Sequence, residues 1–197
     1  MKSYGVRISD APGKYQVRLT VDGKSQTQPL MVRKHPLHTD VTLADLQEQF
    51  ALASQIRDKV SEANNAVILS RDVKGQVADR LTKSDDAKLK STGDVLTKNL
   101  SAVEEDIYQV RNQSGQDPLN FPIKINNRLA SLLGIVNRGD GKPIASAYPI
   151  FTDLKAELKV QSDRLQHVIA VDLPAFNAEA KRLGLPPVTL PIKGPIM

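Results

Sequence analysis

The first part of the chain alternates apolar and polar positions, with the two-residue period of a β-strand. The apolar members of this alternation are Tyr15, Val17, Leu19 and Val21. Such a period predicts a strand with one buried face. Asp22-Gly23 is a turn pair that commonly closes hairpins, and Leu30 and Val32 follow on a predicted return strand, where Pro29 favours an edge. Because two strands alone are marginal in water, we expect this hairpin to pack on something, as the closing strands of an incomplete sandwich do.

From Thr42 onward the apolar residues recur at spacings of three and four, which predicts long amphipathic helices. Thr42 and Asp45 have the pattern of a capping box at the start of the first helix. Its apolar stripe continues for roughly 40 residues to Leu81. Gly75 weakens this helix without ending it.

Ser84-Asp85-Asp86 is expected to cap a second helix that runs to about Gln113, where a serine and a glycine supply a stop. A short third helix then ends near Val136. The last long helix has Tyr148-Pro149 in or near its first turn, and Pro174 is expected to kink or restart it because proline lacks a donor and clashes with the preceding turn.

These elements predict a mainly α fold: an antiparallel up-down helical bundle of three long helices plus one short helix, preceded by a small β-hairpin stub. The expected domain organisation is a hairpin stub at residues 1–35, a linker at 36–41, the helical bundle at 42–184 and an extended tail at 185–197.

The composition narrows the classes of function for this chain of 197 residues. It has 40% apolar and 25% charged residues, as in ordinary soluble proteins, and no Cys, which excludes disulfides and Cys-ligated metals. A net charge of +5 spread along the chain, with few aromatics, argues against a nucleic-acid partner. No apolar run is long enough for membrane insertion, and the amino terminus lacks the pattern of a signal peptide.

The segment 112–128, NQSGQDPLNFPIKINNR, is unusually rich in amides and separates two predicted helices. Its candidate structural or ligand-contact residues are Asn112, Gln113, Ser114, Gln116, Asp117, Asn120, Asn126 and Asn127. One interpretation is a rigid helix connection whose side chains bond to the unpaired groups of the helix ends, with Leu119 and Phe121 closing the end of the bundle. The alternative is a polar pocket that binds a carbohydrate or a partner. Hydrolysis there lacks support because Asp117 has no second acid or His nearby.

For the other residues whose side chains could bind a metal or act in catalysis, structural interpretations are favoured. His35 and His38 lie near Asp40 and offer metal ligands, but a flexible linker favours solvated side chains. The acidic run at residues 104–106 predicts a solvated helix face. No catalytic, cofactor-binding or metal residues are therefore assigned, and no cofactor is expected.

QVRNQSGQDPLNFPIKINNRLASLLGIV at 109–136, together with PGKYQVRLTVDGKSQTQPLMV at 12–32, resembles the carboxy-terminal region of a family of large bacterial proteins. These proteins carry a sortilin-like β-propeller of sialidase-type repeats and are often labelled glycosyl hydrolases. The resemblance covers about residues 12–183, and its specific part is the 112–128 segment. It implies that a small β-sandwich and a helical bundle follow a propeller, in a secreted or periplasmic parent protein.

The family's hydrolase label belongs to the propeller, and this sequence contains no propeller repeats. The expected function is therefore a non-catalytic accessory or scaffold module, with the propeller portion of a parent protein as its partner. The alternatives are a carbohydrate-binding or hydrolytic site around residues 112–122, and a helical protein–protein adaptor.

Overall fold

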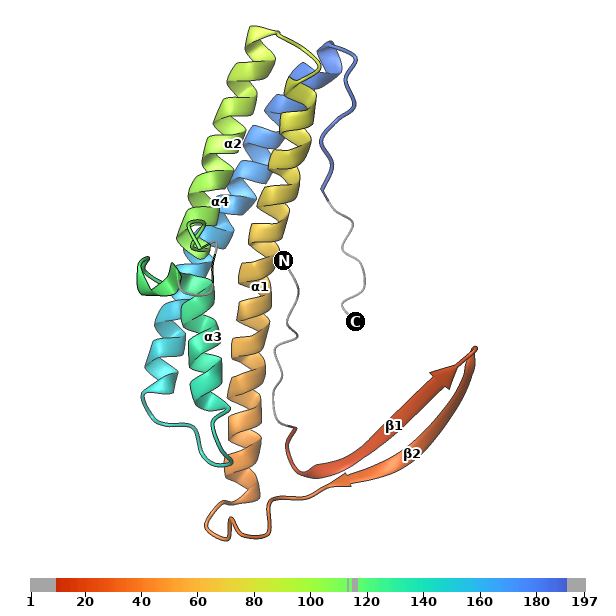
Figure 1. The fold of residues 1–197 in the computed structure, drawn as a ribbon, viewed down its shortest axis with the longest axis vertical. Helices are drawn as coiled ribbons and strands as arrows, with labels where there is room; N and C mark the ends of the chain where they lie inside the picture. Colours follow the sequence, from red (N-terminus) through yellow and green to blue (C-terminus); the bar gives the residue numbers. More distant parts are fainter. Residues whose placement is uncertain (1–9, 113, 115–116, 191–197) are drawn as a thin grey trace. The chain divides into compact units, whose positions relative to one another are not determined.

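A computed structural model describes residues 10–112, 114 and 117–190 of the chain (Figure 1). Its elements are β1 (Gly13–Val21), β2 (Lys24–Val32), α1 (Leu43–Leu81), α2 (Ala87–Ile107), the short 3-10 helix η1 (Asp117–Leu119), α3 (Ile125–Val136) and α4 (Ala147–Arg182). The predicted fold class, a mainly α bundle with three long helices and a short one behind a β-hairpin, is confirmed.

The chain divides into two compact units, and three of the helices contribute to both. The first unit comprises Met1–Asp58 with Leu129–Phe151, and the second comprises Lys59–Arg128 with Thr152–Met197. The hairpin therefore belongs to the first unit, whereas the amide-rich segment between α2 and α3 belongs to the second.

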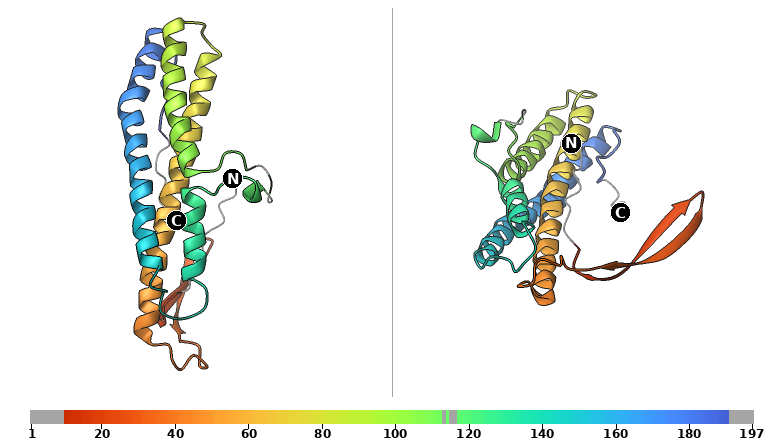
Figure 2. Two further views of the ribbon diagram at one scale, coloured as in Figure 1. Left: turned by 90° about the vertical axis from the view of Figure 1, so that its left-hand side faces the viewer. Right: turned by 60° about the horizontal axis from the view of Figure 1, so that its bottom comes forward.

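In the first unit, β1 and β2 form an antiparallel hairpin in which Val21 lies opposite Lys24 (Figures 1 and 2). Asp22 and Gly23 have φ values of 49° and 76°, as a two-residue type I′ turn requires. The predicted alternation is present, but most of the apolar face is not buried within the described chain. Leu19 is 63% exposed, because no described element covers the part of the apolar face nearer the turn, whereas Tyr15 and Val32 at the open end of the hairpin are half-buried.

The start of α1 has the predicted capping box. The Thr42 hydroxyl accepts from the Asp45 amide at 3.1 Å, and the Asp45 carboxylate accepts in return from the Thr42 amide at 3.0 Å. Hydrogen bonds from the Thr42 side chain and backbone hold the pKa of Asp45 below its ordinary value. One turn further on, the buried Gln49 donates to the carbonyls of Val136 at 2.7 Å and Gly139 at 2.9 Å, which fixes the end of α3.

In the second unit, α1, α2 and α4 pack around an aliphatic core. Bonds between α2 and α4 show that the two helices run antiparallel: Asp86 pairs with Arg182 at 2.7 Å, and Asn99 donates to Asp172 at 2.7 Å. The largest fully buried side chains of this unit are Val67, Val73, Leu89, Leu96, Leu100, Ile107, Leu154, Leu158 and Phe176. Residues 185–190 then lie against α1 and α4 through amide pairs. For example, Asn177 both donates to and accepts from the backbone of Val188. The part of the predicted tail at 191–197 lies outside the described residues.

Two helix boundaries differ from the prediction. The second helix ends at Ile107, not near Gln113, because Tyr108 turns to an extended conformation with φ −129° and ψ 140°. The last helix is continuous from Ala147 to Arg182, so Pro174 lies inside it and does not restart it. None of the helices in the described ranges is long and apolar enough to cross a membrane.

Two glycines of the second unit should respond oppositely to alanine. Gly184 ends α4 at φ 68°, which disfavours side chains, so Gly184→Ala should cost about 1 kcal/mol of unfolding free energy. Gly75 lies inside α1 with open space around its Cβ position, so Gly75→Ala should add about 0.5–1 kcal/mol. Urea unfolding curves measure both changes, and equal signs would contradict the expectation.

Candidate functional site

Asp117 closes the amide-rich segment on itself. Its two carboxylate oxygens accept from the Ser114 amide at 2.6 Å and the Ser114 hydroxyl at 2.9 Å. Its carbonyl accepts from the amides of Asn120 and Phe121, at 2.9 and 3.0 Å. Asp117 therefore stabilises the turn around η1, and both of its acidic oxygens are engaged in that turn.

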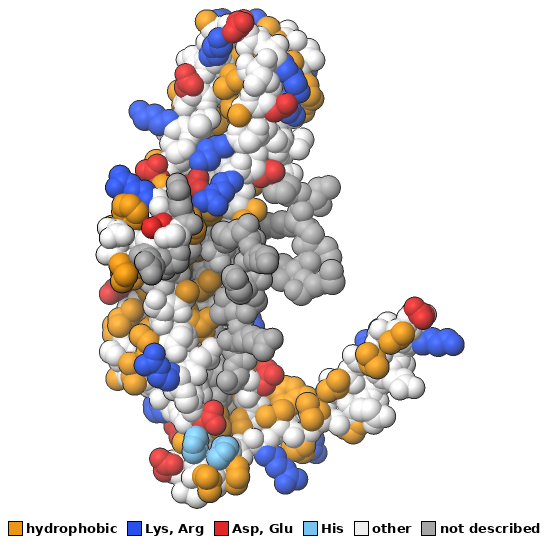
Figure 3. Space-filling view, viewed as in Figure 1, with side chains coloured by type: hydrophobic (Ala, Val, Ile, Leu, Met, Phe, Trp, Pro, Cys, Tyr) orange, Lys and Arg blue, Asp and Glu red, His pale blue; other side chains and the backbone are white. Residues whose placement is uncertain are grey.

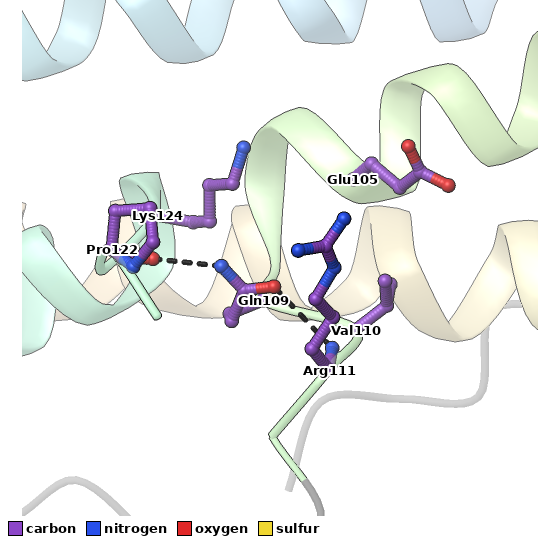
Figure 4. A pocket seen from close by; sticks show the side chains of 6 residues that line it. All are labelled: Glu105, Gln109, Val110, Arg111, Pro122 and Lys124. Carbon is purple, nitrogen blue, oxygen red and sulfur yellow. Dashed lines mark hydrogen bonds between the residues drawn. The ribbon is translucent and has the colours of Figure 1, made fainter. Parts of the chain in front are cut away.

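Gln109 joins the two ends of the segment, a role that the sequence interpretation missed. The side chain is 5% exposed and lies just beyond the end of α2. Its Nε2 donates to the carbonyl of Pro122 at 2.9 Å, and its Oε1 accepts from the Arg111 amide at 3.3 Å (Figure 4). The sequence signal that could have pointed to Gln109 is its position two residues after the apolar Ile107, because an extended backbone places both side chains on the same, buried side.

A cavity of about 280 Å³ lies beside this connection. Its lining residues are Glu105, Gln109, Val110, Arg111, Pro122 and Lys124 (Figure 4). The Arg111 guanidinium is centred 5.7 Å from the ring of Phe121, in reach of a cation–π interaction. Within the described part of the chain, neither Arg111 nor Lys124 has an ion-pair partner. The charged side chains that line the cavity are those of Glu105, Arg111 and Lys124.

The remaining candidate amides are divided between bonded and unpaired groups. Asn126 is 9% exposed, and its amide nitrogen donates to Asn64 at 3.4 Å. The side-chain oxygens of Asn112, Asn126 and Asn127 are buried and accept no hydrogen bond from the residues that the structure describes. Asn120 is exposed. Gln113 and Gln116 lie outside the described residues.

The prediction that Leu119 closes the end of the bundle is wrong. Leu119 is 87% exposed, because the turn around η1 projects away from the helices, as both views in Figure 2 show. Phe121 is partly buried, under the Arg111 guanidinium. The connection is thus held by polar contacts and by this one aromatic ring.

The two linker histidines lie beside a different acid from the expected one. The rings of His35 and His38 are 4.9 Å apart, and His38 Nδ1 lies 3.6 Å from Asp140, not Asp40. The Nδ1 atom of His35 accepts from the Leu37 amide, at 3.3 Å. Throughout the described residues, no group of three or more His, Asp or Glu side chains is placed to hold a metal ion.

The acidic run on α2 contains one residue that is not solvated, which corrects the prediction for this helix face. Glu104 is 4% exposed and forms ion pairs with Arg71, at 2.5 Å, and Lys74, both on α1. Burial raises its pKa, but hydrogen bonds from Lys74 and Arg71 together lower it by more, so the net pKa lies below its ordinary value. Glu104 therefore stays ionised and links α1 to α2.

Comparison of the chain with known proteins found no similar protein. No family model matches the chain, and no curated protein or solved structure does either.

Proposed function

We propose that this protein is a non-catalytic accessory module that docks onto a β-rich partner through its hairpin. The observation that carries the proposal is the apolar face of β1 and β2, which is exposed although its composition suits a buried interface. Val17, Leu19 and Val21 of this face are 53%, 63% and 57% exposed, and Leu30 is 47% exposed. Figure 3 shows the hydrophobic side chains that gather along the hairpin. Apolar patches of this kind on a soluble protein indicate an interaction site.

The chemistry of the amide-rich segment supports the non-catalytic part of the proposal. The one acid in its centre, Asp117, has both carboxylate oxygens bonded to Ser114. These bonds give the carboxylate a role in the turn that does not require a substrate. The bonds of Asp117 and Gln109 instead serve the connection between α2 and α3, and leave the helices as a scaffold for the hairpin.

The resemblance of residues 12–32 and 109–136 to sortilin-like propeller proteins suggests the partner class, a propeller with its β-sandwich. A reading frame for propeller repeats next to this gene would support that assignment, and a solitary gene would weaken it.

A double substitution on the hairpin tests the docking role. Val17→Ser with Leu19→Ser removes the centre of the apolar face, at positions that are already exposed, so the fold should remain intact. The tagged 197-residue chain should copurify with a recombinant propeller–sandwich polypeptide. The double variant should lose at least about 90% of that yield, as expected when a central anchor is removed. Ile68→Ser with Val171→Ser, on exposed helix positions, is the matched control. Equal yields from all three proteins would contradict the proposal.

The buried, unpaired oxygens of Asn112, Asn126 and Asn127 favour a second candidate, a site for a polar ligand such as a carbohydrate. Asp117→Ala separates this candidate from the first. If Asp117 only caps the turn, the variant should lose about 1 kcal/mol of stability, as cap removal does, and show no change on a glycan array. Loss of sialoside or β-glucan turnover in this variant, with circular dichroism unchanged, would instead show that the segment is an active site.

A further inference from the structure

The hairpin has two outer edges, and they differ in their capacity to pair with another strand. Val21 and Lys24 flank the two-residue turn and form a hydrogen-bonded pair. From there, hydrogen-bonded and non-hydrogen-bonded pairs alternate along the ladder. The 2.8 Å contact between the hydroxyls of Thr20 and Ser25 fits the closer approach of side chains in a non-hydrogen-bonded pair. The alternation therefore shows which backbone groups point outward.

On β1 the outward positions are Lys14, Gln16, Arg18 and Thr20, and each has an amide donor. On β2 they include Pro29, which lies opposite Gln16 and has no donor. The outer edge of β2 is thus interrupted at its middle, a recognised way to block strand addition. The outer edge of β1 is uninterrupted, and in the described sheet no third strand pairs with it.

The side chains beside this edge define the chemistry of a strand that would pair with it. Lys14 and Arg18 lie on one face of β1, and neither has an ion-pair partner among residues that the structure describes. Val17 and Leu19 lie on the other face and are exposed. Opposite charges and apolar pairs stabilise neighbouring positions of adjacent strands, whereas like charges destabilise them. A second copy of β1, paired antiparallel about Gln16, would place Lys14 beside Arg18 and so a cation beside a cation.

We infer that the outer edge of β1 takes up an extended segment of the partner in which acidic and apolar residues alternate. The segment adds antiparallel to the sheet, so that its carboxylates lie beside Lys14 and Arg18 and its apolar side chains extend the exposed face. This assignment rests on the docking role proposed above and specifies the mode of docking, by strand addition to one edge.

Proline substitutions at two outward positions test the assignment on the whole 197-residue chain. Gln16→Pro removes an outward amide donor from β1, and Thr27→Pro removes one from β2. Both residues belong to non-hydrogen-bonded pairs of the hairpin, so neither substitution removes a hydrogen bond between β1 and β2. The probe is a short synthetic peptide in which valine alternates with glutamate, titrated by NMR. Gln16→Pro should weaken binding by about tenfold or more, and Thr27→Pro by less than about twofold. The Hα–Hα cross-peak between Thr20 and Ser25 verifies that each hairpin is intact.

A charge reversal gives a second test that leaves the backbone unchanged. Arg18→Glu should lose the glutamate peptide and gain binding to a peptide in which valine alternates with lysine. Equal effects of the two prolines, no response to Arg18→Glu, or a dimer of the protein that Gln16→Pro abolishes would each overturn the assignment. If Val17→Ser with Leu19→Ser abolishes propeller binding while Gln16→Pro does not, docking uses the face alone. The proposed function then stands and the edge assignment fails.

Discussion

Phe176→Ala is expected to lower the free energy of unfolding by about 3–5 kcal/mol, the range for truncation of a large core aromatic. The Phe176 ring is fully buried in the second unit. Its Cε2 atom lies 3.3 Å from the place where a Cβ on Gly93 would be, and Leu81 approaches the same place to 3.2 Å. The ring occupies space that is available because Gly93 has no side chain. Replacing the ring by the alanine methyl group therefore leaves a cavity in closely packed surroundings. Urea unfolding, followed by circular dichroism, measures the change.

Val171→Ala on the same helix is the matched control, since Val171 is 50% exposed and should change stability by less than about 0.5 kcal/mol. Gly93→Ala should be destabilising alone, because Leu81 and Phe176 occupy the space. Combined with Phe176→Ala it should cost less than the sum of the single effects, as contacting residues do. Additive costs would mean that the ring does not depend on Gly93.

Glu104→Gln is expected to cost about 2–3 kcal/mol near neutral pH, somewhat below the 3–5 kcal/mol found when one partner of a buried pair is removed. The substitution leaves Arg71 and Lys74 without their counter-ion. The reduction reflects the exposure of those cations, 43% and 23% of their side chains, which lets water replace part of the lost contact. Glu105→Gln, one position along on the exposed side, should change stability by less than about 0.5 kcal/mol.

The effect of Glu104 should depend on pH with a definite sign. Its pKa is lowered in the folded chain from the ordinary value of 4.5. The carboxylate therefore stabilises the fold fully above that value, and the contribution disappears as the pH falls through the lower, folded-state pKa. Wild type and Glu104→Gln should differ by a constant amount at neutral pH and converge in acid. A difference that grows below pH 4.5 would contradict the ion-pair explanation.

Local patterns were sufficient to predict the helices and the hairpin turn. Thr42 and Asp45 marked the start of α1 because a capping box depends on residues one turn apart. Asp22-Gly23 marked the turn because both positions require positive φ. Gly75 was expected to leave α1 intact, and it does, because one glycine costs less than the packing of a long apolar stripe contributes.

Features that depend on distant residues were not predicted. The end of α2 at Ile107 is followed by Gln109, whose amide bonds to the carbonyl of Pro122, 13 residues along the chain. The burial of Glu104 requires the cations of α1, which are about 30 positions earlier, and no local rule reports such a pairing. In the candidate site, the sequence located the polar segment and Asp117, but not Gln109 or the cavity beside it. These depend on how the ends of two helices meet.

The placement of Pro29 limits how far the protein can assemble. Amyloid-like growth needs a ladder that is open above and below, so that each added chain offers a template to the next. In this hairpin, Pro29 interrupts the outer edge of β2 near its middle, so only the outer edge of β1 can pair with another strand. In the docking mode that we propose, a chain that has engaged its partner would offer no second edge of the same kind, so we expect complexes of fixed stoichiometry and no fibres.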